Sequence, residues 1–187
     1  MNEQSTYQDS FVTWLEELRD KEDRGTLAAM RRWLSQPEGT LGEASRVVQK
    51  RLAMNASNAQ ESAYHLVGAL FALHPEAGGE GNMGDHFRKL CENPNEPPAN
   101  VERRFMALLA SDANQLDDTL RQAIALLKAN SVPVDWHQLM RHVLTLKGHN
   151  DEARLRVQRW WARRFWRSES ASTTVKSQAS ASETQSV

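Results

Sequence analysis

Residues 63–73, AYHLVGALFAL, constrain the fold more than any other segment, because a helix of this sequence is apolar on almost every side. Such a helix has no face suited to solvent, so other elements must surround it. His74-Pro75 ends the apolar run. The segment therefore predicts the buried centre of a helical bundle.

Helical periodicity also dominates the rest of the chain, and no segment shows the alternation of a strand. Phe11, Leu15 and Leu18 predict a helix over 9–22. A short helix is expected around Phe87–Cys91, after a loop at 76–84. Other helices are predicted by Leu27, Met30 and Leu34; Val47, Val48 and Leu52; Phe105, Leu108 and Leu109; and Leu116, Leu120, Ile124 and Leu127. The expected fold class is all-α.

Two further helix starts are marked by capping residues. Asp135 is expected to be an N-cap, with Gln138 three residues later completing a capping box. Asn150 or Asp151 is expected to cap the last helix. Both signals lie in the second half of the chain, which is therefore expected to be as helical as the first.

The stretch 93–98, NPNEPP, is the best candidate for a boundary between two helical units. We therefore predict two small helical bundles packed together, residues 1–96 and 97–167. The tail, residues 168–187, is rich in Ser, Thr, Ala and Gln and has no aromatic residue. Such a composition cannot bury a core, so the tail is expected to be disordered.

Composition indicates a soluble cytoplasmic protein with a polarised charge. No apolar run approaches the roughly 20 residues of a membrane helix, and the N-terminus has no signal-peptide pattern. Cys91 is the only cysteine, so no intramolecular disulfide can form. The net charge of −1 by itself argues against a nucleic-acid binder, but residues 1–23 are acid-rich whereas 154–167 hold six arginines and no acid.

The sequence contains no recognisable catalytic or metal-binding pattern. His137 and His142 are five residues apart on one predicted helix, which puts them on different faces. Residues 78–81, GGEG, lack both the preceding strand and the following Lys-Ser/Thr of a phosphate-binding loop. We expect no enzyme, no metal site and no cofactor, and we expect the histidines at the surface or at helix ends.

Basic residues border several of the apolar stripes, and they are the candidate nucleic-acid-binding residues. Their aliphatic stems can lie on the protein while the charged ends reach phosphates. Each one alone is more simply a solvated side chain, but together they suggest a groove that follows a phosphate backbone. The candidates are Arg31, Arg32, Arg46, Lys50, Arg103, Arg104, Arg121 and Lys128.

The segment 154–167, RLRVQRWWARRFWR, interleaves arginines with aromatic residues. One interpretation is base stacking with phosphate contact, and the other is aromatic residues in the core with arginines outside. Val157, Trp161 and Phe165 are four residues apart, so we expect them in the core. Trp160 and Trp166 then remain as exposed or interface residues.

Several segments in a fixed order resemble the CasB family, the small subunit of the type I-E CRISPR effector complex Cascade. The resemblance spans about residues 11–166 and is carried by FVTWLEEL, DRGTLAAMRRWL, AYHLVGALFALHP, ERRFMALLASD, LRQAIALLKANSVPVDW and WWARRFW. It implies an all-helical protein of two small bundles without catalytic activity. It also implies a second copy of the chain in the complex, contacts with the backbone spine and large subunits, and contacts with guide RNA and with target and displaced DNA.

Family basic positions match Arg32, Arg104 and Arg121, and Arg31 and Arg103 accompany them. The resemblance implies that these residues contact nucleic-acid backbone. The chain departs from some relatives by having no Lys or Arg between Arg51 and Arg88, and by having Leu146-Lys147 where relatives often have tryptophan.

Two other functions fit the residues. A helical DNA-binding regulator would need a recognition helix with exposed polar residues. A protein-interaction scaffold would use the same arginines for acidic partners. The resemblance favours a subunit that stabilises the R-loop formed by guide RNA and target DNA.

Overall fold

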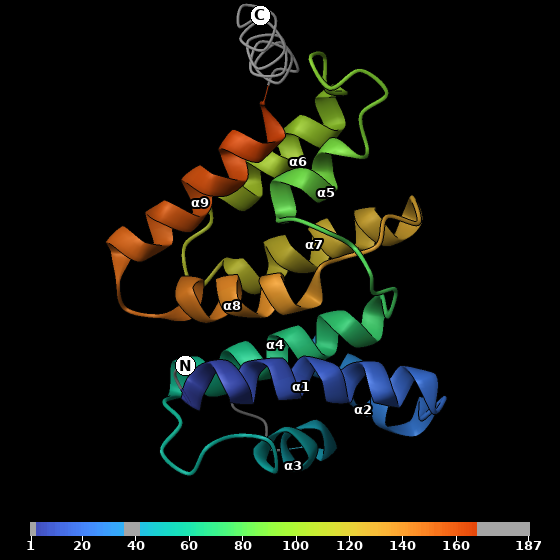
Figure 1. Cartoon of the computed structure of the whole chain (residues 1–187), viewed down its shortest axis with the longest axis vertical. Coiled ribbons are helices and arrows are strands. Elements are labelled where there is room, and N and C mark those ends of the chain that lie inside the picture. Colours follow the sequence, from blue (N-terminus) through green and yellow to red (C-terminus); the bar gives the residue numbers. More distant parts are fainter. Residues whose placement is uncertain (1–2, 36–41, 168–187) are drawn as a thin grey trace, which may run out of the picture.

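The computed structural model describes residues 3–35 and 42–167, and within these ranges the regular structure is helical with no strand (Figure 1). The predicted all-α class is confirmed. The tail that was expected to be disordered, residues 168–187, lies outside the described residues. The helices are α1 (Glu3–Asp20), α2 (Arg24–Trp33), α3 (Glu43–Gln49), α4 (Asn58–Leu73), α5 (Met83–Arg88), α6 (Ala99–Ala110), α7 (Leu116–Ala129), α8 (Trp136–Lys147) and α9 (Asp151–Phe165).

Helix α4 is the buried centre that its sequence predicts. Every residue from Ala63 to Ala72 is buried, and α2, α3, α7 and α8 pack around the helix. Figure 1 shows α3 and α8 on opposite sides of α4. Helix α1 closes the arrangement by packing on α2 and α8, with its Phe11 ring 4.6 Å from that of Tyr64 in α4.

Helices α5, α6 and α9 pack together at the other end of the molecule (Figure 1). The Phe105 ring of α6 lies 5.1 Å from that of Phe87 in α5 and 4.3 Å from that of Phe165 in α9. Helix α5 approaches α9 very closely at Gly84, where an added Cβ would lie 2.0 Å from the backbone oxygen of Trp161. Only glycine permits this approach, so Gly84 determines how α9 is seated.

The buried apolar residues of the described ranges form one continuous core cluster. The cluster runs across residue 97, and α5, which precedes that residue, packs chiefly on α9. The division into bundles 1–96 and 97–167 stays a prediction.

Capping side chains explain where several helices begin. Asp135 accepts a hydrogen bond from the Gln138 amide, and Asn150 accepts one from the Ala153 amide, so both predicted starts are confirmed. The Gln138 side-chain oxygen has no partner among the described residues, so the expected second half of the capping box is not formed.

The helix expected around Phe87–Cys91 begins earlier than predicted. Asn82 and Asp85 form a capping box that starts α5 at Met83, inside the predicted loop. The chain leaves the helix at Lys89, so Cys91 lies outside it. None of the helices in the described ranges is long and apolar enough to cross a membrane.

Candidate nucleic-acid interface

All eight predicted nucleic-acid-binding residues are exposed on the structure. Arg31 and Arg32 lie on α2, and Arg103 and Arg104 lie on α6. Of the other four, one lies on α3, one at the end of α3 and two on α7. Because these side chains project from helices, their stems are held while their charged ends reach solvent. Those other four residues are Arg46, Lys50, Arg121 and Lys128.

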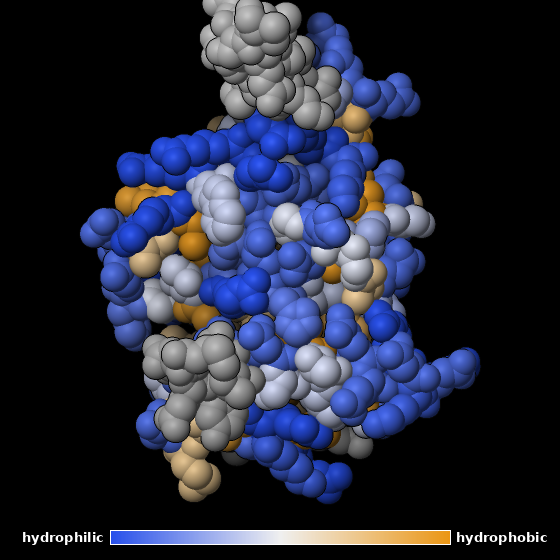
Figure 2. Space-filling view, viewed as in Figure 1, coloured by the Kyte–Doolittle hydropathy of each residue, from blue (hydrophilic) through white to orange (hydrophobic). Residues whose placement is uncertain are grey.

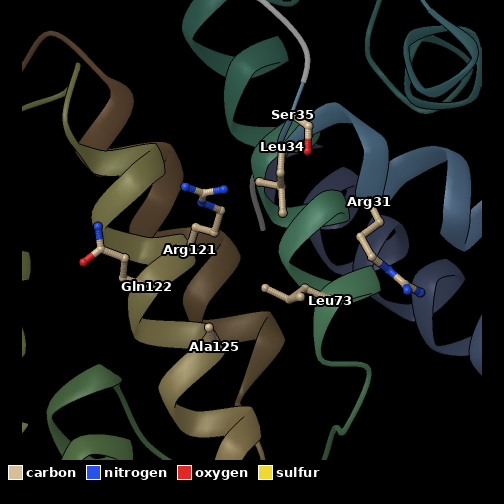
Figure 3. Close-up of a pocket in the computed structure, with 7 residues that line it drawn as sticks. All are labelled: Arg31, Leu34, Ser35, Leu73, Arg121, Gln122 and Ala125. Atoms are coloured by element: carbon tan, nitrogen blue, oxygen red, sulfur yellow. The ribbon is translucent and has the colours of Figure 1, made fainter.

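The structure brings Arg31 and Arg121 to one cavity of about 380 Å³, between α2 and α7 at the end of α4 (Figure 3). The Arg121 side chain extends from α7 towards the end of α2, whereas that of Arg31 points away from Arg121 in this view. The apolar part of the lining is Leu34, Leu73 and Ala125. The cavity therefore pairs an apolar wall with the Arg121 cation, an arrangement that suits a phosphate and its attached sugar.

The two arginines of this cavity differ in how firmly the fold holds them. Arg31 donates from Nε to the backbone oxygen of Ala72 at 3.0 Å, which satisfies a carbonyl at the C-terminal end of α4. Arg121 lies 3.5 Å from Asp118 on its own helix, and both side chains are largely exposed. An exposed ion pair of this kind stabilises a helix by only about 0.5 kcal/mol, so a phosphate can replace Asp118 easily.

The remaining candidates do not line this cavity. Arg46 and Lys50 are four residues apart and share a face of the α3 segment. Arg121 and Lys128 are seven residues apart on α7, which places them on one face about 10 Å apart along the axis. In the described ranges, no acidic side chain forms an ion pair with Arg46, Lys50, Arg103, Arg104 or Lys128.

Helix α9 has the two-sided character that its sequence predicts. Val157, Trp161 and Phe165 are buried, whereas Trp160 and Trp166 are 47% and 42% exposed. Figure 2 shows a band of strongly hydrophilic surface over α9. The eight predicted residues include none from this helix, although the buried stripe already indicates which of its arginines face outward.

A second cavity, of about 540 Å³, lies between α5 and the end of α9, and two of the arginines that line it make internal contacts. Arg88 donates to the backbone oxygens of Phe165 and Arg167, which completes the C-terminal end of α9. Arg164 pairs with Asp85 at 2.7 Å. Arg88 and Arg164 are thus engaged within the fold, whereas Lys89 and Arg167, which also line this cavity, are exposed.

The expectation that the histidines lie at the surface or at helix ends is wrong for His65 and His142, which are buried in mid-helix. His142 accepts a hydrogen bond from Nε1 of Trp161 at 3.0 Å, and His86 accepts one from the Asp135 amide at 3.2 Å. Burial lowers the pKa of both histidines to about 4, so both are neutral at pH 7.

Packing against a tryptophan also accounts for the burial of His65, whose ring stacks on that of Trp33 at 5.4 Å. Burial lowers its pKa, and the nearby Glu61 opposes this effect. Among the described residues, no three His, Cys, Asp or Glu side chains are placed to hold a metal ion together.

Residues 26–166 match the model of the CRISPR-associated protein Cse2 family. The chain belongs to the Cse2 family. The Cse2 protein of Thermus thermophilus is 32% identical over 158 residues, which are 83% of this chain and 88% of the relative. The resemblance to the CasB family is thereby confirmed, because the chain also matches solved structures named as CasB and as a Cse2-family protein, both from Thermus thermophilus.

Solved structures share the fold along almost their whole length. CasB from Thermus thermophilus matches with a TM-score of 0.71 and 29% identity, covering 86% of this chain and 98% of that one. CasB from M. ruber matches with a TM-score of 0.68 and 25% identity, covering 90% and 97%. A chain of a CRISPR RNA-guided surveillance complex, 20% identical, has the same fold with a TM-score of 0.67 over 94% and 97%.

Proposed function

We propose that this Cse2-family chain is a non-catalytic small subunit of a type I-E Cascade complex. It binds nucleic-acid backbone without sequence specificity and stabilises the guide RNA–target DNA R-loop and the displaced strand. Its proposed partners are the backbone spine and large subunits, a second copy of itself, guide RNA, and target DNA. Family membership supports this proposal, as does the shared fold with a chain of a CRISPR RNA-guided surveillance complex.

The observation that carries the nucleic-acid part of the proposal is the distribution of exposed cations over α2, α3, α6 and α7. Five of the eight predicted residues have no acidic partner among the described residues, so their charges are available to phosphates. Cations on rigid helices contact the backbone, which is the same for every sequence, and so they position a strand without reading its bases.

Sequence-independent contacts of this kind suit an R-loop. Forming one exchanges a DNA duplex for an RNA–DNA duplex of similar stability, so the exchange is nearly balanced. A few phosphate contacts to the displaced strand can therefore tip it. This argument needs neither a base-reading pocket nor a chemical step.

The first test is the affinity of the full chain for fluorescent single-stranded DNA at several salt concentrations. The Arg32→Ala/Arg104→Ala/Arg121→Ala variant removes the three matched family positions. One phosphate contact contributes about 0.7 to the slope of log affinity against log salt for a single strand. Losing three contacts lowers the slope by about 2 and weakens binding about 100-fold at 0.1 M salt.

A matched control removes three exposed cations from outside the eight predicted residues, in the variant Lys21→Ala/Arg24→Ala/Arg141→Ala. These cations lie 3.1 to 3.3 Å from Glu17, Glu22 and Asp9. The control should bind within about threefold of wild type. Absence of wild-type binding at low salt would favour a protein scaffold, and preference for one duplex sequence would favour a regulator; either result contradicts the proposal.

A further inference from the structure

Two arginines of α9 hold the helix in the fold. Arg154 donates to the backbone oxygens of Leu146 and Gly148, at 3.2 and 2.9 Å, and so ties α9 to the end of α8. Arg164 donates to Asp85 at 2.7 Å and ties α9 to α5. These two side chains are committed to internal contacts and are set apart from the other arginines of the helix.

Three other arginines form a ridge on the opposite side of α9. Arg156, Arg159 and Arg163 are spaced by three and four residues, so they share one face and span about 10 Å along the axis. All three are exposed, and the hydrophilic band over α9 in Figure 2 accords with this face. In the described ranges, neither Arg159 nor Arg163 has an ion-pair partner.

Arg156 has one acidic neighbour, which does little to neutralise the ridge. Its guanidinium lies 3.6 Å from the carboxylate of Glu152, and the two side chains are 71% and 87% exposed. An ion pair this exposed contributes little and is screened by salt. The ridge therefore presents three cations to solvent.

Tryptophans that the fold holds in place flank the ridge. The Trp160 ring stands edge-on to that of His142 at 5.2 Å, while 47% of the residue stays exposed. The Trp166 ring meets that of Phe105 at 5.6 Å, and its Nε1 donates to Glu102 at 3.2 Å. Both tryptophans thus contact the fold while 42–47% of each residue stays exposed, and exposed aromatic side chains of this kind can stack on bases.

Arginines beside open tryptophan rings match the chemistry of a single-stranded nucleic acid. Phosphates pair with the guanidinium groups, and unpaired bases stack on the indoles. A duplex keeps its bases stacked inside and could use only the cations. An acidic protein segment could likewise satisfy the arginines but has no base to offer the rings.

We propose that the α9 face, made of Arg156, Arg159, Trp160, Arg163 and Trp166, is a binding surface for single-stranded nucleic acid. It is separate from the cavity between α2 and α7. The choice of a nucleic acid as the ligand rests on the proposed function. None of the eight predicted residues belongs to this surface. Because Arg154 and Arg164 fix α9, the surface is formed before the strand arrives.

The test compares Arg159→Ala/Arg163→Ala with Lys21→Ala/Arg24→Ala, which removes the same charge from exposed residues with carboxylate partners. The ligand is fluorescent oligothymidylate, and the protein is the full chain. Losing two phosphate contacts lowers the salt slope by about 1.4 and weakens binding about 25-fold at 0.1 M salt. The control should stay within about twofold of wild type.

Tryptophan emission provides a second readout at the same face. Oligothymidylate should quench the emission of the wild type, and the Trp160→Phe variant should show a smaller quench with affinity within about threefold, because phenylalanine still stacks. An equal quench in the variant means that no base reaches Trp160. That result would overturn the stacking part of the inference.

The outcomes separate this inference from the proposed function. If the α2, α6 and α7 triple variant weakens binding and the α9 double variant matches its control, the α9 face is refuted and the proposed function stands. If only the α9 variant weakens binding, the α9 face stands and the predicted arginines do not carry the function. Absence of wild-type binding, or equally strong competition by polyglutamate of equal charge, overturns the α9 face as a nucleic-acid site.

Discussion

Replacing Gly84 with alanine tests how α9 is seated, because this glycine lies where α5 meets α9. A Cβ at this position would lie 2.0 Å from the backbone oxygen of Trp161, 2.9 Å from the amide nitrogen of Phe165 and 3.0 Å from the carbonyl carbon of Trp161. All three atoms belong to the backbone, so no side-chain rotation relieves the clash. The two helices must move apart.

The magnitude follows from the required movement. Ordinary contact begins at about 3.4 Å, so the 2.0 Å approach must lengthen by about 1.4 Å. This separation loosens the packing of Met83 and Phe87, which are buried. Overpacking a core typically costs about 1–3 kcal/mol, and a clash between backbones belongs at the upper end. For a chain of this size, about 3 kcal/mol lowers the melting temperature by about 6–12 °C.

Thermal unfolding followed by circular dichroism measures this effect, and Gly25→Ala is the matched control. A Cβ on Gly25, in the first turn of α2, would meet only the Asp23 carboxylate oxygen at 3.6 Å, an ordinary contact. Alanine there should be neutral or stabilise by up to about 1 kcal/mol. If Gly84→Ala melts within about 1 °C of wild type, the close approach of α5 and α9 is not a constraint and the reasoning fails.

The other predictions concern pH and two neighbouring arginines. Burial lowers the pKa of His86 and His142 to about 4 in the folded state, whereas the pKa of an unfolded histidine is about 6.5. Their contribution to the free energy of unfolding is therefore complete above pH 6.5 and is lost as the pH falls towards 4. Urea unfolding should show a loss of about 2 kcal/mol per histidine between pH 7.5 and pH 5, and His142→Gln should make this loss smaller. Arg164→Ala should destabilise by about 1–2 kcal/mol, because the largely buried Asp85 carboxylate loses its ion-pair partner and keeps only the Asn82 amide. Arg163→Ala should change stability by less than about 0.5 kcal/mol and should weaken oligothymidylate binding. The reverse order in melting temperatures would contradict the division of α9 into an inner and an outer face.

The sequence predicted those parts of the fold that depend on residues close together in the chain. The all-round apolar run of α4 could only be a buried helix, and the spacing of Val157, Trp161 and Phe165 indicated the covered side of α9. The caps Asp135 and Asn150 could be predicted for the same reason, since each accepts a hydrogen bond from the amide three positions later. The start of α5 was missed although Asn82 and Asp85 carry the same signal, because the glycines around them indicated a loop.

Contacts between distant segments could not be predicted in this way. Arg164 and Arg163 are adjacent in the sequence, and the Asp85 partner of Arg164 is 79 residues away. Arg31 and Arg121 come from α2 and α7, and nothing in either segment indicates that they border one cavity. The burial of His142 likewise depends on Trp161 of the following helix. Which arginines are structural and which are available to a ligand is therefore a property of the tertiary structure.

The net charge of −1 does not oppose nucleic-acid binding once the charges are placed in the fold. Many acids belong to residues 1–23, where Asp9 and Glu17 pair with Arg141 and Lys21. Figure 1 shows α8 lying between α1 and α9, and α8 packs on both. Because salt screens charges beyond about 10 Å at 0.1 M, a strand at the α9 face responds to the arginines beside it and not to the total. Lowering the salt lengthens this range, so repulsion from the acidic end should make the measured salt slope shallower at the lowest concentrations than at 0.1 M.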